Sequence, residues 1–274
     1  MKKINANALR CMLLLLTFTF SACEDVIEVD LPSGEAKIVI DAEIVWQKGT
    51  DGSVQSIKIS RMADYYNPTP PKVSGAEVYV ENAAGEVFTF IEAAEPGLYI
   101  CSNFVPELNG IYTLSVTVEG ETYTATETLI PVSEINRVEQ QVIQDIEGDN
   151  IEVAFYYDDP VNQANLYLTE FDTDVLPYPE YELTDDEFFN GNEIRNEISE
   201  EDLLPGVAVE ITLRGVSRQF YNYMNLILET SSSNPFSTPS ANIRGNVVSQ
   251  GNSQSYALGY FRLCESDRVM YVIE

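Results

Sequence analysis

The pattern of apolar and polar residues divides the chain into a short apolar run and a long alternating region. The run, residues 11–20, follows three basic residues near the start. A membrane-spanning helix needs roughly 20 consecutive apolar residues, so this run is too short to remain as one. Beyond it, short segments rich in Val, Ile, Thr, Tyr and Phe alternate with polar residues, which is typical of β-strands with one buried face.

The first half of the alternating region predicts a β-sandwich. Seven strand-like segments are separated by short turns: residues 36–46, 53–61, 76–81, 86–91, 97–101, 111–118 and 121–130. Asn82–Gly85 and Glu119–Gly120 are hairpin turn sequences. About seven strands in a hundred residues are expected of an immunoglobulin-like fold. We therefore predict an immunoglobulin-like β-sandwich over residues 36–131 that folds on its own.

The second half, residues 132–274, predicts a second β-rich domain. Its predicted strands are residues 151–157, 165–171 and 206–216, followed by a closing hairpin of 255–264 and 268–273 that turns at 265–267. Residues 170–189 are acidic and aromatic and contain two prolines, which predicts a long excursion over the surface.

One short helix is predicted near residues 217–231. Ser217 can cap its start, because a serine oxygen accepts a hydrogen bond from a free N–H of the first turn. The apolar residues that follow keep helical spacing: Phe220, Met224, Ile227 and Leu228. The chain is thus predicted to be mostly β.

The segment before the first strand has the order of a lipoprotein signal peptide over residues 1–22. The basic residues and the apolar run are followed by Ser21, Ala22 and Cys23. Phe20–Cys23 resembles a bacterial lipobox, with Phe20 in place of the usual leucine. We predict that the thiol of Cys23 is lipidated and anchors the protein to a membrane. Residues 23–35 are polar and acidic and are predicted to be a tether.

The charge of the chain and its lack of histidine exclude several classes of function. The chain has 44 acidic and 15 basic residues, for a net charge of −29, so a nucleic acid partner is not expected. With no histidine, Ser-His-Asp, Cys-His and His-ligated zinc sites are excluded. We predict no cofactor, no metal site and no catalytic residue, although a carboxylate-dependent hydrolase of glycans or peptides stays open.

Three groups of residues are candidates for a function. The acidic residues of the excursion offer oxygen ligands for calcium, but they do not follow the EF-hand spacing and are predicted to be a solvated loop: Asp172, Asp174, Asp185, Asp186 and Glu187. Aromatic residues of the loops are predicted to form a binding surface, with packing under their own loops as the alternative: Tyr65, Tyr66, Tyr178, Tyr181, Phe188 and Phe189. Cys101 and Cys264 are predicted to be buried free thiols rather than a disulfide.

Several stretches together resemble the Bacteroidetes lipoproteins grouped as domain-of-unknown-function family 4249. The markers, in order, are AKIVIDAEI, ISRMADYYNPTPPKVSGAEVYVENAAGEVF, GLYICSNFVPELNGIYTLSVTVEGETYTA, DDPVNQANLYL, NPFSTPSANIRGN and ALGYF. The resemblance runs from Cys23 nearly to the C-terminus. It implies a lipid-anchored protein of the outer membrane that assists a SusC-like TonB-dependent nutrient transporter, without catalysis. A structural or adhesive surface lipoprotein is the remaining alternative.

Overall fold

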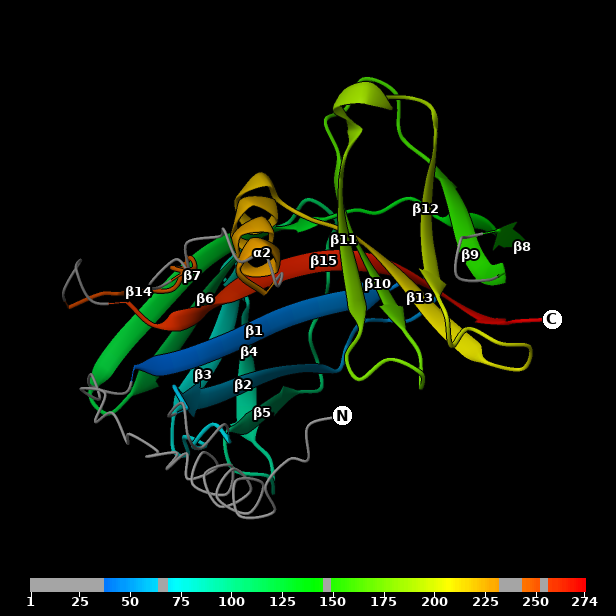
Figure 1. Cartoon of the computed structure of the whole chain (residues 1–274). Helices are drawn as coiled ribbons and strands as arrows, with labels where there is room; N and C mark the ends of the chain where they lie inside the picture. Colours follow the sequence, from blue (N-terminus) through cyan, green and yellow to red (C-terminus); the bar gives the residue numbers. More distant parts are fainter. Residues whose placement is uncertain (1–36, 64–68, 145–148, 232–242, 252–255) are drawn as a thin grey trace, which may run out of the picture. The chain divides into compact units, whose positions relative to one another are not determined.

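The computed structural model describes residues 37–63, 69–144, 149–231, 243–251 and 256–274 (Figure 1). The predicted signal peptide, the tether and Cys23 lie outside the described residues. Residues 36–274 form one compact unit. Strands account for most of it, and α2 (Arg218–Ser231) is the α-helix of the described part. The prediction of a mostly β chain is confirmed.

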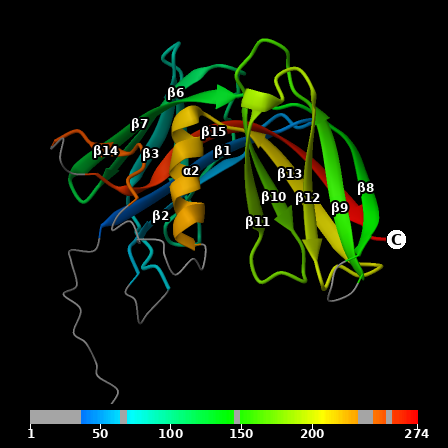
Figure 2. The same ribbon diagram turned by 45° about the horizontal axis from the view of Figure 1, so that its top comes forward.

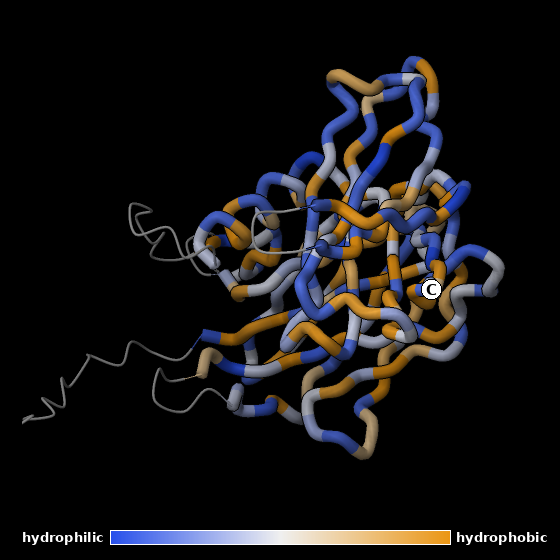
Figure 3. The backbone as a smooth tube through the Cα atoms, turned by 45° about the vertical axis from the view of Figure 1, so that its right-hand side comes forward, coloured by the Kyte–Doolittle hydropathy of each residue, from blue (hydrophilic) through white to orange (hydrophobic). Residues whose placement is uncertain are grey.

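All seven strands predicted in the first half are present. They are β1 (Ile38–Gln47), β2 (Gln55–Arg61), β3 (Glu77–Asn82), β4 (Val87–Glu92), β5 (Leu98–Cys101), β6 (Ile111–Val118) and β7 (Glu121–Ile130). Alternate side chains are buried along them; in β6 these are Tyr112, Leu114, Val116 and Val118. Figure 3 shows the same alternation as changes between hydrophobic and hydrophilic colour along the strands.

A tight hairpin joins β6 to β7, as its sequence predicts. Glu119 and Gly120 are its two loop residues, with φ angles of 53° and 82°. Two positive φ angles are typical of the turn whose twist matches paired antiparallel strands. Local turn chemistry therefore sets the register of this pair.

The last strand, β15 (Leu258–Val272), closes the first sandwich. It pairs in parallel with β1 over Val39–Gln47 and, at Leu263 and Cys264, with β7 (Figure 1). The strands then form a closed ring in the order β15-β1-β2-β5-β4-β3-β6-β7. Buried side chains of the strands in this ring form one hydrophobic core. β15 contributes Phe261 and Leu263 to it. The predicted immunoglobulin-like β-sandwich is thus completed by the far end of the chain.

The second sandwich has sheets of three and four strands. β8 (Ile135–Gln144), β9 (Asp149–Asp158) and β12 (Glu193–Glu200) form the first sheet. β11 (Glu180–Asp185), β10 (Leu166–Asp172) and β13 (Ala208–Gly215) form the other with the second half of β15. Buried residues of both sheets pack into a second core. Close to Pro131 the chain passes from the first hydrophobic core to the second. The sequence predicts a domain boundary at the same place.

The predicted closing hairpin is wrong, because β15 runs unbroken through residues 265–267. These polar residues hold the link between the two sandwiches instead of turning. The buried Glu265 carboxylate accepts the N–H of Val132 at 2.9 Å and pairs with Lys48 at 3.1 Å. Asp267 accepts the N–H of Ile135 at 2.7 Å.

The predicted surface excursion is also wrong over most of its length. Residues 170–172 belong to β10, residues 180–185 form β11, and a 3-10 turn, η2 (Asp186–Phe188), follows. Strands β8, β11 and β12 have no counterpart in the prediction. Most residues of β8 and β11 are only partly buried, so the alternation that marks a strand is weak in them.

The predicted helix is confirmed at both ends as α2. Ser217 caps it by accepting the N–H of Phe220 at 3.2 Å. The helix lies on the outer face of the sheet (Figure 2), where Phe220 and Met224 pack with Leu166 and Leu168 of β10. The short strand β14 (Val248–Ser249) pairs with β7 beyond the helix. No helix in the described part of the chain is long and apolar enough to cross a membrane.

Candidate functional site

The described members of the predicted aromatic surface lie in different places. Tyr65 and Tyr66 lie outside the described residues. Tyr178 is 81% exposed on the loop between β10 and β11. Tyr181 lies in β11 and packs with the residues under α2, as the packing alternative expects. Tyr178 and Tyr181 therefore have different environments.

Phe188 and Phe189 lie at the opposite end of β11 from Tyr178, where η2 leads toward β12 (Figure 1). Phe188 is 84% exposed and Phe189 45%. Val161, on the loop between β9 and β10, is 63% exposed and lies against Gly191. We call these three residues, Val161, Phe188 and Phe189, the apolar tip.

A buried carboxylate holds the first loop of the apolar tip in place. Asp159 accepts hydrogen bonds from the hydroxyl of Tyr167 at 2.6 Å, from the side chain of Asn165 at 3.2 Å and from the N–H of Gly191 at 3.0 Å. Burial and this bond to Asp159 raise the pKa of Tyr167, so its hydroxyl stays a donor at neutral pH. The loop between β9 and β10 is thereby tied to the end of η2.

A second buried carboxylate, Asp186, ties the same two loops from the other side. It accepts the N–H of Asn165 at 2.8 Å and the side-chain amide of Asn190 at 3.3 Å. Asn190 in turn accepts the N–H of Asn162 at 3.0 Å. A charge-assisted hydrogen bond to a buried group is stronger than a neutral one. The backbone under the apolar tip is therefore fixed although its side chains are exposed.

Two of the calcium candidates thus serve as hydrogen-bond acceptors and ion-pair partners. Asp186 is buried as just described, and Asp185 pairs with Arg218 of α2 at 2.6 Å. This bond to Arg218 holds the pKa of Asp185 below its ordinary value. Within the described ranges no group of three or more carboxylates or thiols is placed to hold a metal ion.

A chain of ion pairs crosses the outer face of the sheet from β10 to β1. Arg214 of β13 pairs with Glu170 at 2.5 Å and reaches Glu43 at 3.5 Å. Arg262 of β15 also pairs with Glu43. Burial alone would raise the pKa of Glu43, but the charges of Arg262 and Arg214 outweigh it and hold the pKa below its ordinary value. This network joins strands of both sandwiches.

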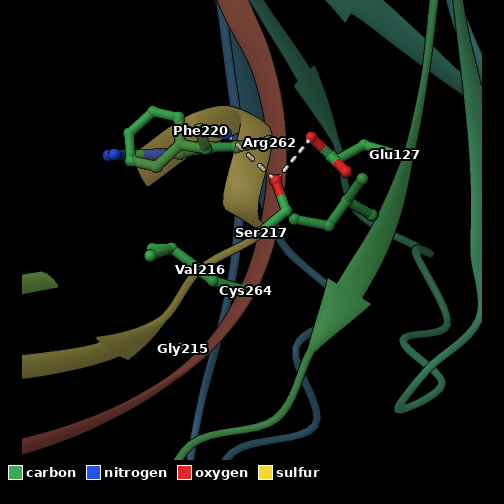
Figure 4. Close-up of a pocket in the computed structure, with 8 residues that line it drawn as sticks. Glu127, Gly215, Val216, Ser217, Phe220, Arg262 and Cys264 are labelled. Atoms are coloured by element: carbon green, nitrogen blue, oxygen red, sulfur yellow. Dashed lines mark hydrogen bonds between the residues drawn. The ribbon is translucent and has the colours of Figure 1, made fainter. Parts of the chain in front are cut away.

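The start of α2 is anchored on the first sandwich through Glu127 of β7 (Figure 4). Its carboxylate accepts the hydroxyl of Ser217 at 3.0 Å and that of Tyr260 at 3.1 Å. Burial raises the pKa of Glu127. Arg262 lies over the ring of Phe220 at 4.5 Å. Glu127, Ser217, Phe220 and Arg262 line a small hollow that has no room for a water molecule, so their side chains hold the helix and leave no site for a ligand.

A larger hollow of about 510 Å³ opens on the other side of α2. Tyr260 links the two hollows, because it lines this one and its hydroxyl donates to Glu127, which lines the small one. The lining residues come from α2, from the segment before β14 and from the start of β15: Gln219, Asn222, Tyr223, Leu226, Arg244, Gly245, Asn246 and Tyr260. We call it the α2 hollow.

The wall of the α2 hollow is made where two late markers of the family resemblance meet. Asn246 donates to the carbonyl of Phe261 at 2.8 Å and accepts its N–H at 2.9 Å. Only glycine fits at Gly245, because a Cβ there would lie 1.8 Å from the carbonyl oxygen of Gly259. Residues 245 and 246 of the first marker therefore dock on the marker ALGYF.

Both described cysteines are buried free thiols, as predicted. Burial raises the pKa of the Cys264 thiol to about 12. A thiol must lose its proton to act as a nucleophile. Cys264 is therefore an inert part of the packing under α2.

The sequence of the chain matches a protein-family model, whereas its similarity to solved structures is weak. Residues 24–268 match the family model described as a domain of unknown function (DUF4249). No curated protein matches the chain.

Solved structures with partial similarity include three of interest. A two-domain fibronectin type-III segment of chicken tenascin is 13% identical, with 58% of this chain and 83% of that chain covered and a TM-score of 0.22. A cytokine receptor complex is 8% identical, with 67% and 86% covered and a TM-score of 0.26. A DUF4785 family protein from Legionella pneumophila is 13% identical, with 64% and 50% covered and a TM-score of 0.25.

Proposed function

The chain belongs to the family described as a domain of unknown function (DUF4249), and from this premise we propose that it is a non-catalytic, lipid-anchored accessory protein of the outer membrane that binds a SusC-like TonB-dependent nutrient transporter. The lipid on Cys23 is the anchor, and residues 23–35 are the tether. The resemblance of the sequence supports the membrane and the transporter. The structure supports a binding role through one feature, the apolar tip.

The apolar tip has the properties of a protein-binding surface. Large apolar side chains are costly to expose, and exposed apolar groups held together are a mark of interaction sites. Aromatic residues are enriched among those that dominate binding energies. Two buried carboxylates fix the backbone below Phe188 and Phe189. A prearranged surface loses less conformational entropy on binding than a mobile loop does.

The charges around the apolar tip define the partner further. Glu187 is exposed next to Phe188, and Asp158 is exposed next to the buried Asp159. A partner that fits has an apolar recess with basic residues at its rim. Opposite charges mainly raise the association rate, and aromatic burial mainly slows dissociation. Added salt should therefore slow association more than it speeds dissociation.

The test is a pull-down of tagged protein from detergent-solubilised outer membranes, with transporters identified by mass spectrometry. We expect the wild-type protein to recover a TonB-dependent transporter. Phe188→Ser with Phe189→Ser should lower recovery at least tenfold, because burying each ring contributes about 1.5–3 kcal/mol. Both rings are already exposed, so the melting temperature of the protein should stay unchanged.

Tyr178→Ser is the matched control, because Tyr178 is an equally exposed aromatic residue at the other end of β11. It should leave recovery unchanged. Absence of any transporter with the wild-type protein would reject the proposed function. If Tyr178→Ser lowers recovery of the transporter and the double variant does not, the binding surface is on the β10–β11 loop instead.

A further inference from the structure

The α2 hollow has the size and lining of a small-molecule site. Its volume of about 510 Å³ falls within the range of roughly 300–1,000 Å³ that is usual for ligand pockets. It lies on residues separate from the apolar tip and does not depend on the proposed partner. Its lining combines aromatic rings, amide side chains and one guanidinium group.

Arg244 lines this hollow, and Lys37 lies beside it over the same aromatic ring; neither has a carboxylate partner among the described residues. Eight of the twelve arginines and lysines of the described residues form ion pairs, and Arg244 and Lys37 are among the four that do not. Both lie instead against one ring, that of Tyr256: Lys37 Nζ is 3.5 Å and Arg244 Cζ 4.5 Å from its centroid. The two charges are therefore close together. In a chain with 44 acidic residues, such a pair marks a place suited to an anion.

The geometry of Arg244 favours a carboxylate. The Arg244 guanidinium lies over the Tyr256 ring, and a guanidinium group over an aromatic ring can still donate the N–H groups at its edge. Two parallel N–H groups match the two oxygens of a carboxylate. Charges more than about 8 Å away are largely screened at physiological salt. The local pair therefore outweighs the distant acidic surface at this point.

The rest of the lining fits a sugar ring. Tyr223 of α2 and Tyr260 of β15 line the hollow with ring centroids 4.9 Å apart, and Tyr260 is 7% exposed. Gln219 and Asn222 contribute amide groups that make no hydrogen bond among the described residues. An amide can both donate to and accept from a hydroxyl. Aromatic faces and free amide groups together suit a sugar ring, which has apolar C–H faces and hydroxyl groups at its edges.

We propose that the α2 hollow binds a saccharide that carries a carboxylate, a uronate. Its carboxylate lies against the Arg244 guanidinium, with Lys37 adding charge. Its ring lies against Tyr223 and Tyr260. Gln219 and Asn222 bind its hydroxyls.

Titration calorimetry of residues 23–274 with three probes tests this: trigalacturonate, triglucuronate and trimannuronate. We expect at least one to bind, and maltotriose, a neutral saccharide of the same length, to bind at least tenfold more weakly. Arg244→Gln should weaken binding of the uronate about tenfold or more, because a charge-assisted hydrogen bond contributes about 1.5–3 kcal/mol. Lys37→Gln should weaken it less.

Arg268→Gln is the matched control, since it removes the same charge from an exposed arginine that pairs with Glu210 on the second sandwich. It should leave uronate binding unchanged. Failure of all three uronates to bind at 5 mM would overturn the proposal. Equal binding of maltotriose, or equal loss with Arg268→Gln and Arg244→Gln, would overturn the role given to Arg244.

Discussion

The two sandwiches differ in how far along the chain their strands find partners. In the first, β2–β7 are joined mainly by short connections, such as the Asn82–Gly85 and Glu119–Gly120 turns. In the second, β9 pairs with β12, and β10 and β11 lie between them in the chain. Yet the strand that closes the first sandwich, β15, is the most distant of all. Local pairing therefore builds most of the first sandwich without completing it.

The second sandwich also depends on β15, through a different part of the strand. Residues 266–272 pair with β13, whereas residues 258–266 pair with β1. Ser266 has a partner on both sides. A single continuous strand thus belongs to two hydrophobic cores. This argues that the two sandwiches fold and unfold together.

The largest effect is expected when β15 is removed from the first sandwich, which tests whether this sandwich can fold without it. Residues 36–131 alone leave β1 and β7 with an open edge each and lack Phe261 and Leu263 of the core. We expect this fragment to show no cooperative thermal transition by circular dichroism, whereas residues 36–274 melt cooperatively. The sequence predicts the reverse, an independent unit. Unpaired buried backbone groups and a missing core strand are each costly enough to unfold a domain of this size.

A fragment that carries residues 256–266 on a flexible linker is the control. Because β15 runs parallel to β1, the linker must be long enough to return along the strand. We expect it to restore cooperative melting. A fragment of residues 36–131 that melts as the whole chain does would show that β15 is dispensable to the first sandwich.

The sequence predicts the first sandwich well because its strands carry their evidence locally. Strict alternation and turn residues identify each strand within about ten residues. β8 and β11 carry a weaker signal, because most of their residues are only partly buried. Residues 265–267 have the composition of a turn, and only the tertiary contacts of Glu265 with Val132 and Lys48 explain why they stay extended.

The candidate site is less accessible to sequence reasoning. The exposure of Phe188 and Phe189 agrees with the predicted surface, whereas Tyr181 packs under α2. The α2 hollow is missed, because Tyr223, Arg244 and Tyr260 come from three separate segments. One signal was available: two glycine-containing markers, ANIRGN and ALGYF, occur close together late in the chain. Glycine that fits only for lack of a Cβ marks a close backbone approach.

A single substitution of Glu265, at the link between the two sandwiches, should have the next largest effect on stability. Glu265→Ala leaves the N–H of Val132 without its acceptor and Lys48 without its partner. We expect a loss of about 2 kcal/mol in the free energy of unfolding by denaturant titration, since a buried group is left unsatisfied. One transition with an unchanged m-value should remain, because both sandwiches share β15.

Glu210→Ala is the control, because it breaks the more exposed pair with Arg268, which lies farther along β15. We expect a loss below about 1 kcal/mol. Two separate transitions in Glu265→Ala would mean that the junction, rather than the shared strand, couples the sandwiches.

The smallest effect concerns Glu127, through which α2 rests on the first sandwich. Burial raises the pKa of its carboxyl group above the ordinary value. Between the ordinary and the raised pKa, the folded protein binds more protons than the unfolded one, so this group lowers stability as the pH rises through that window. The loss grows as the pH rises through the raised pKa, and below the ordinary pKa it is absent. Glu127→Gln removes the charge and keeps an oxygen that accepts from Ser217 and Tyr260.

We therefore expect Glu127→Gln to unfold at higher denaturant concentration than the wild type at pH 7, and at the same concentration at pH 4. Ser217→Ala separates charge from capping, because it removes the oxygen that accepts the N–H of Phe220 and should cost about 1 kcal/mol at both pH values. If Glu127→Gln is less stable than the wild type at pH 7, the ionised carboxylate is a net stabilising contact between α2 and β7. In that case the helix, as well as β15, couples the two sandwiches.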